Sequence, residues 1–64
     1  DYLIIFNSMK PDKNGDFLIN DFISLVRKQN PSFDYKKLGF ENVFKFILSL
    51  RLFKVYKSKY LKLK

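Results

Sequence analysis

The sequence predicts an α+β domain of the winged helix-turn-helix type, with three to four short helices followed by a C-terminal β-hairpin wing. Two patterns indicate this fold. Apolar residues recur at helical spacing up to residue 50, and from residue 52 the spacing changes to alternation. The 64 residues make one domain, residues 1–64, and eight Phe and four Tyr help supply its core without disulfides or a metal.

The first helix is predicted at the start of the chain. Its apolar face comprises Tyr2, Leu3, Ile5, Phe6 and Met9. Pro11 stops this helix because it has no N–H to continue the ladder of hydrogen bonds. Residues 11–16 are rich in turn formers, above all Asn14-Gly15, and residues 17–19 follow as a very short strand. Since the chain opens at Asp1 without an initiator methionine, we expect a piece of a longer protein whose first helix is truncated.

The second helix is predicted between residues 20 and 30. Asn20 or Asp21 is placed to cap its N-terminus, because a short oxygen-bearing side chain can accept a hydrogen bond from the first turn. Asn30 and Pro31 end the helix. Its apolar face comprises Phe22, Ile23, Leu25 and Val26.

Two further helices are predicted between residues 34 and 50. Asp34 caps a short helix that runs through Leu38. Gly39 then allows the chain to reverse, and residues 40–50 form the helix in the recognition position. On a helical wheel the apolar face comprises Val43, Phe44, Ile47, Leu48 and Leu50, and the polar face Glu41, Asn42, Lys45 and Ser49. Phe46 lies at the margin, where we favour the rim of the core over an exposed contact surface.

The alternation after residue 52 predicts a β-hairpin with a loop at residues 57–59. Its apolar side chains share the core face in one register, with these pairs: Val55 with Leu61 and Phe53 with Leu63. The same register places two pairs on the outer face: Tyr56 with Tyr60 and Lys54 with Lys62. Like charges opposite each other repel, so an external anion would relieve this arrangement.

Most of the net charge of +7 lies in the hairpin. Residues 51–64 contain six bases and no acid, whereas residues 1–50 contain seven bases and six acids. A concentrated basic stretch indicates a polyanionic partner, either a nucleic acid or an acidic surface. The alternative is a lysine-rich tail that is merely solvated.

Composition excludes several kinds of site. Without Cys or His there is no thiol nucleophile, imidazole base or usual zinc ligand, and we expect no catalysis. The segment from Asp12 looks like the start of an EF-hand loop, but Phe17 and Ile23 stand where Gly and a bidentate Glu are needed. We therefore expect no metal, no cofactor and no small-molecule substrate. The apolar runs are too short to span a bilayer, so we expect no membrane and an intracellular, cytoplasmic setting.

Much of the sequence resembles the OST-HTH/LOTUS domain. The resemblance is carried by Asn14-Gly15, by Ile19-Asn20-Asp21-Phe22, and by residues 25–40, which include Pro31-Ser32-Phe33-Asp34 and Gly39-Phe40. The family signature is a helix ending in a basic pair, a Pro-x-Phe-Asp turn, a short basic helix, a leucine-rich helix and a basic hairpin. Residues 14–64 follow it throughout. The departures are Leu38 for a frequent Tyr, Ile23 for a frequent Gly, and an aromatic displaced to Phe17.

The resemblance implies a winged-helix RNA-binding module. Similar domains are regarded as RNA-binding, some with a preference for G-rich or quadruplex RNA, and in bacteria they commonly follow a NYN-type nuclease domain. Animal versions with an added C-terminal helix dock a DEAD-box helicase. Here the sequence stops at Lys64, after the second strand of the hairpin, which makes helicase docking the weaker expectation.

Two hypotheses for function follow. The first is RNA binding, with these nucleic-acid-binding residues: Lys36, Lys37, Lys45, Lys54, Tyr56, Lys57, Lys59, Tyr60 and Lys62. The lysines would contact phosphates, and the two tyrosines would stack on bases or on a G-tetrad. The second is a protein-interaction or dimerisation module, in which the wing or the surface around Phe46 docks a partner protein or a second copy. A repressor of double-stranded DNA is a weaker third choice, because the predicted recognition helix offers few base-reading side chains.

Overall fold

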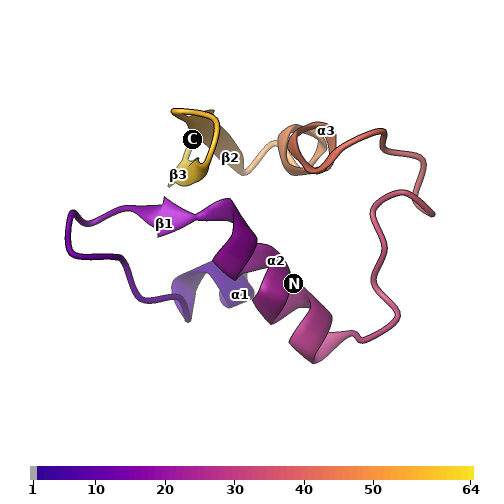
Figure 1. The fold of residues 1–64 in the computed structure, drawn as a ribbon, viewed down its shortest axis with the longest axis horizontal. Helices are drawn as coiled ribbons and strands as arrows, with labels where there is room; N and C mark the ends of the chain where they lie inside the picture. Colours follow the sequence, from indigo (N-terminus) through magenta and orange to yellow (C-terminus); the bar gives the residue numbers. More distant parts are fainter. Residues whose placement is uncertain (1) are drawn as a thin grey trace.

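The computed structural model describes residues 2–64. In chain order the elements are α1 (Tyr2–Asn7), β1 (Phe17–Leu18), α2 (Ile19–Gln29), α3 (Val43–Ser49), β2 (Phe53–Tyr56) and β3 (Tyr60–Leu63) (Figure 1). Over these residues the chain therefore has three helices and one antiparallel sheet of three strands in the order β1-β3-β2. The α+β, winged-helix prediction is confirmed.

The core lies between the α1–α2 pair on one side and α3 with the hairpin on the other (Figure 1). Five large side chains are almost completely enclosed: Phe22, Phe46, Phe53, Ile47 and Leu61. The Phe53 ring of the hairpin lies 5.4 Å from Phe22 of α2 and 5.0 Å from Phe6 of α1. Such aromatic pairs contribute about 0.5–1.5 kcal/mol each beyond the burial of their area, so they bind the wing to the helices.

The segment after α1 forms a polar turn. The helix ends at Asn7, four residues before the Pro11 that we expected to stop it. The Asp12 carboxylate accepts hydrogen bonds from the amides of Asn14 (2.8 Å) and Asp16 (3.0 Å). Asp12 therefore orders its own loop, which is a common use of this side chain in turns.

The start of α2 corrects one prediction. Asn20 and Asp21 lie inside the first turn, Leu18 occupies the capping position, and no side-chain hydrogen bond caps the helix. Instead, the Ile19 amide donates to the carbonyl of Lys59 in the hairpin turn (2.9 Å). Because β1 runs directly into α2, the hairpin backbone satisfies the first amide of the helix, which no carbonyl within the helix can reach. The other end agrees with the prediction, since α2 stops at Gln29 and Asn30 follows as its cap.

The connection between α2 and α3 contains no helix at residues 34–38, so that prediction was wrong. The chain makes consecutive turns, in which Lys37 donates to the Asp34 carbonyl (3.1 Å) and Gly39 to the Lys36 carbonyl (3.0 Å). The Asp34 carboxylate accepts from the Lys36 amide two residues on (2.9 Å), which is the pattern of an Asx turn and not of a helix cap. Gly39 has a φ of 98°, as its expected role in the reversal requires.

Helix α3 is shorter than predicted and is rotated about its axis. It starts at Val43, because the Asn42 side chain caps it by accepting from the Lys45 amide (3.0 Å). Phe46, expected at the margin, is only 2% exposed, whereas Phe44 is 37% exposed. Leu48 is also exposed, at 54%. The cause is aromatic packing: the Phe46 ring lies 5.1–5.7 Å from three rings, those of Tyr2, Phe33 and Phe40.

The hairpin has the predicted register. The pairs are Phe53 with Leu63, Lys54 with Lys62, Val55 with Leu61 and Tyr56 with Tyr60. Phe53 and Leu61 are buried, whereas Leu63 is half exposed because the strand extends past the core. The pairing of β1 with β3, which joins Phe17 to Leu61, was not predicted and completes the sheet.

The turn of the hairpin is strained in a way that can be tested. Lys57 and Ser58 have φ of 51° and 60°, and the Lys59 amide donates to the Tyr56 carbonyl (3.2 Å). Two successive positive φ values are typical of a type I′ turn, which favours Asn and Gly. We expect Ser58→Gly to raise the free energy of unfolding by about 0.5–1 kcal/mol, because Gly adopts this conformation without a steric penalty.

Urea unfolding monitored by circular dichroism measures this effect. Ser24→Gly is the matched control, because Ser24 lies inside α2, where the same change should cost about 0.5 kcal/mol. A loss of stability in Ser58→Gly would show that the turn is not strained.

Candidate nucleic-acid interface

The outer face of the hairpin gathers six of the nine predicted binding residues. This wing face comprises Lys54, Tyr56, Lys57, Lys59, Tyr60 and Lys62. Its four lysines are exposed, Tyr56 is 39% exposed and Tyr60 is partly buried. Because residues 51–64 contain no acid, no carboxylate of the hairpin neutralises this face. A fixed positive surface of this kind attracts polyanions.

Three of the four lysines of the wing face lie over its tyrosine rings. The Lys62 ammonium is 4.2 Å from the centroid of the Tyr56 ring, and that of Lys57 is 5.2 Å from the same centroid. The Lys59 ammonium is 5.3 Å from the centroid of Tyr60. These cation–π contacts are worth about 0.5–1 kcal/mol each at an exposed site. The tyrosines were predicted as stacking surfaces for bases, and in the structure they also contact the lysine side chains.

The two tyrosine rings adjoin each other across the strands. Their centroids are 6.2 Å apart and their planes are inclined by 35°. This arrangement follows from the register, because directly opposed residues on one face of an antiparallel pair lie close together. A base that stacks on the face of Tyr56 that carries an ammonium must displace that ammonium, so charge and stacking compete there.

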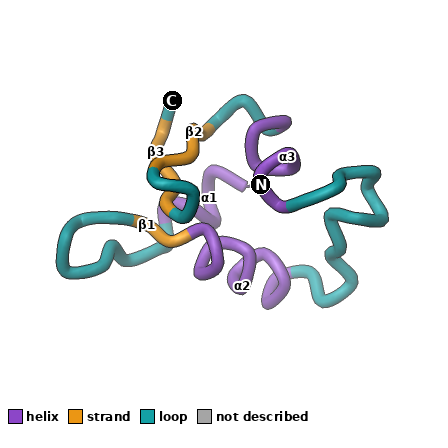
Figure 2. Tube along the Cα trace, turned by 45° about the horizontal axis from the view of Figure 1, so that its top comes forward, coloured by secondary structure: helices purple, strands orange, loops and turns teal. Residues whose placement is uncertain are grey.

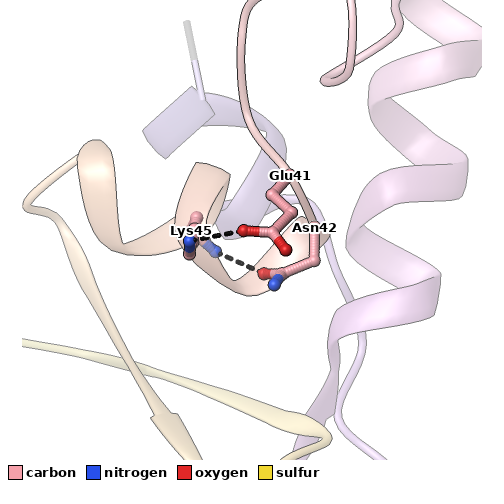
Figure 3. A network of polar contacts seen from close by, with 3 residues as sticks. All are labelled: Glu41, Asn42 and Lys45. Atoms are coloured by element: carbon pink, nitrogen blue, oxygen red, sulfur yellow. Dashed lines mark hydrogen bonds and ion pairs between the residues drawn. The ribbon is translucent and has the colours of Figure 1, made fainter.

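Lys45 is engaged by a neighbouring acid. Its ammonium lies 2.7 Å from a carboxylate oxygen of Glu41, one turn earlier, while its backbone amide donates to Asn42 (Figure 3). Both side chains of the ion pair are largely exposed, at 60% and 77%, so water weakens the attraction. The Glu41 carboxylate nevertheless offsets the positive charge of Lys45 on this part of the surface, whereas the sequence predicted Lys45 as a phosphate contact.

Lys36 and Lys37 are exposed but are not part of the wing face. They lie in the loop between α2 and α3, which extends from the side of the molecule opposite the hairpin (Figures 1 and 2). The structure thus brings together the six hairpin residues and leaves these two lysines separate from them.

The structure also contains a hollow beside the hairpin turn, which the sequence did not predict. It has a volume of about 300 Å³, and three separate segments line it: Leu18, Ile19 and Asn20; Val43 and Phe44; Ser58 and Lys59. The lining is mostly apolar and contains one lysine and no carboxylate. The sequence signal for it was the large number of apolar residues on α3, among them Val43 and Phe44, which we assigned to the core.

Neither a metal-binding cluster nor a membrane-spanning helix is found within residues 2–64. No three His, Cys, Asp or Glu side chains of this part of the chain are grouped to hold a metal ion. None of its helices is long and apolar enough to cross a membrane.

Comparison with known proteins identifies one family. The model of the OST-HTH/LOTUS domain matches residues 3–60 of the 64-residue chain, which includes α2, α3, nearly all of α1 and the hairpin up to the first residue of β3. No curated protein and no solved structure matches the chain.

Proposed function

The chain belongs to the OST-HTH/LOTUS domain family, and on that premise we propose that it is a non-catalytic RNA-binding module accessory to a larger protein. The family is one of non-catalytic binding domains that are generally RNA-binding modules. The observation that carries the proposal is the wing face, where four exposed lysines share one side of the hairpin with an adjoining pair of tyrosines. Nucleic acid is the partner that matches both the charge and the aromatic rings.

The lysines supply the affinity in this proposal. Each ammonium that contacts a phosphate releases condensed counterions, so binding weakens as salt rises. The pairing of Lys54 with Lys62 places two like charges opposite each other, an arrangement that costs free energy until an anion lies between them. A phosphate backbone across the hairpin would supply that anion.

The tyrosines favour RNA with accessible bases over a regular duplex. A-form duplexes hide their base faces in the stack, whereas loops, ends and the outer tetrads of quadruplexes expose them. We therefore propose single-stranded or G-rich structured RNA as the ligand. We further propose that residues 1–64 form one domain of a longer cytoplasmic protein, with a NYN-type nuclease domain as the expected neighbour.

The test is a binding titration with labelled G-rich, U-rich and duplex RNA at two ionic strengths. We expect the single-stranded and G-rich ligands to bind more tightly than the duplex. The logarithm of the affinity should fall with the logarithm of the salt concentration by about 0.7 for each phosphate contacted in a single strand. Absence of binding to all three, or binding that salt does not weaken, would refute the proposal.

Breaking the ion pair between Glu41 and Lys45 is expected to strengthen RNA binding. We expect Glu41→Gln to increase RNA affinity about two- to fivefold at low salt, because it removes a negative charge and releases the Lys45 ammonium. Fluorescence anisotropy with the G-rich RNA measures this change. In a chain that also carries Lys45→Gln, the same substitution should increase RNA affinity by a smaller factor. Equal gains in both backgrounds would show that Lys45 does not contact the ligand.

A protein-interaction or dimerisation module is the second candidate. Phe46, which we considered as a docking residue, is buried and cannot serve. The observation that favours this function is the exposure of Phe44 and Leu48, one turn apart on the outer side of α3. Light scattering of the chain without RNA separates the two candidates, because a dimer with no RNA affinity would support the second alone.

A further inference from the structure

The hollow beside the hairpin turn lies between parts of the chain that are distant in sequence. Asn20 and its neighbours form one wall, Val43 and Phe44 another, and the hairpin turn at Ser58 and Lys59 a third. The hydrogen bond from the Ile19 amide to the Lys59 carbonyl (2.9 Å) joins the first wall to the third. This bond fixes the position of the first wall relative to the third.

We propose that this hollow accepts a single unstacked base of the bound RNA, with Phe44 as the ring against which the base packs. The inference rests on the proposed RNA-binding function and adds to it a base-binding pocket beside the phosphate-binding wing face. At about 300 Å³ the hollow is at the lower limit of the sizes found for small-molecule sites, which suits one base and not a pair.

Phe44 is the residue that points to an aromatic ligand. The chain has eight phenylalanines, and the other seven all make ring contacts within the core. Phe44 alone makes none with any residue of the 2–64 range, and it remains 37% exposed. A large ring that the core does not use, in the wall of a hollow, offers a stacking surface to a base.

The polar groups around the hollow suit the edge of a base and its phosphate. The Asn20 side chain is exposed and makes no hydrogen bond to any other described residue, so its carbonyl oxygen and amide nitrogen are both available. An amide that donates and accepts can pair with the edge of an unpaired base. Lys59 lines the hollow and also belongs to the wing face, so it can hold the phosphate next to the inserted base.

The position of the hollow sets the kind of RNA it can accept. It opens beside the hairpin turn, at the end of the wing face. A strand whose phosphates follow the wing lysines would bring a nucleotide to this turn. Only an unpaired base can leave its stack at little cost, so the pocket would select single-stranded segments or loops over duplex.

The experiment compares two RNA ligands and two variants of the chain. The ligands are a labelled single strand of about eight nucleotides and an abasic strand with the same number of phosphates. The variants are Phe44→Ala and the control Leu48→Ala, which removes an exposed apolar side chain from α3 outside the hollow. We expect Phe44→Ala to weaken binding of the base-bearing strand about fivefold or more. It should leave the abasic strand and the salt slope unchanged, and Leu48→Ala should change neither ligand.

Asn20→Ala is a second test that leaves the helix α3 intact. We expect it to weaken binding of the base-bearing strand severalfold and to leave binding of the abasic strand unchanged. If both pocket variants bind like the wild type while binding stays salt-dependent, the base pocket is refuted and the RNA-binding function stands. If the wild-type chain binds neither strand, the proposed function itself fails. If Phe44→Ala instead dissociates a dimer detected by light scattering, the hollow is a protein interface and the inference is overturned.

Discussion

Replacing Phe46 with alanine is expected to lower the free energy of unfolding by about 3–5 kcal/mol, which is close to the total stability of a domain of this size. The reason is the position of the ring at the centre of the core, where it contacts the rings of Tyr2, Phe33 and Phe40. Truncation removes these contacts and leaves a cavity that the surrounding backbone can fill only in part. The variant should be largely unfolded at 25 °C.

Phe44→Ala on the same helix is the control for Phe46→Ala. Because the Phe44 side chain is partly exposed and contacts no other ring, its loss should cost less than about 1 kcal/mol. Urea unfolding of both variants, followed by circular dichroism, compares the two costs. Equal costs would mean that α3 is rotated about its axis relative to the structure described above.

Reversing the charge of the hairpin turn is expected to have the largest effect on binding. We predict that Lys57→Glu with Lys59→Glu weakens RNA binding at low salt about tenfold or more. If each lysine contacts one phosphate, the salt slope should also fall by about 1.4, the value for two contacts to a single strand. Both side chains are exposed, so the fold should tolerate the change. Anisotropy titrations over a range of salt concentrations measure the affinity and the slope together.

Lys36→Glu with Lys37→Glu is the matched control for the hairpin variant, because it changes the net charge equally. These two lysines lie in the loop on the far side of the molecule from the hairpin (Figures 1 and 2). We therefore expect a smaller loss of affinity and little change in the slope. If the two double variants are equally weak, the RNA responds to the net charge of the chain and not to the wing face.

The hairpin could be predicted in detail because alternation leaves few choices. Once Phe53 and Leu61 must share the buried face, a shift of one residue between the two strands would turn one of them to solvent. The register and the opposed lysine and tyrosine pairs follow from that requirement together with a short loop at residues 57–59. The contacts between the ammonium groups and the rings do not, because they depend on rotamers of long side chains.

The rotation of α3 could not be predicted in the same way. Apolar residues occupy positions on most sides of this helix, so a wheel identifies no single buried face. The choice between Phe46 and Phe44 is made by rings from α1 and from the loop before α3. The hollow beside Phe44 escaped prediction for the same reason.

The capping of α2 shows a second limit of local sequence patterns. Asn20 and Asp21 have suitable side chains, yet the helix begins before them, at Ile19, whose amide donates to the carbonyl of Lys59, far along the chain. Asp34 shows the converse, because its carboxylate does accept a nearby amide but orders a turn instead of a helix. Short polar side chains predict that a backbone amide is satisfied locally, and they do not reveal which motif results.

The strand order β1-β3-β2 has a consequence for synthesis of the protein on the ribosome. The central strand, β3, is the last of the three in sequence, so β1 has no partner until residues 60–63 have been made. The helices can begin to associate earlier, but the sheet closes in one late step. Nascent chains halted before β3 emerges from the exit tunnel should therefore remain sensitive to protease, and those halted after it should become resistant.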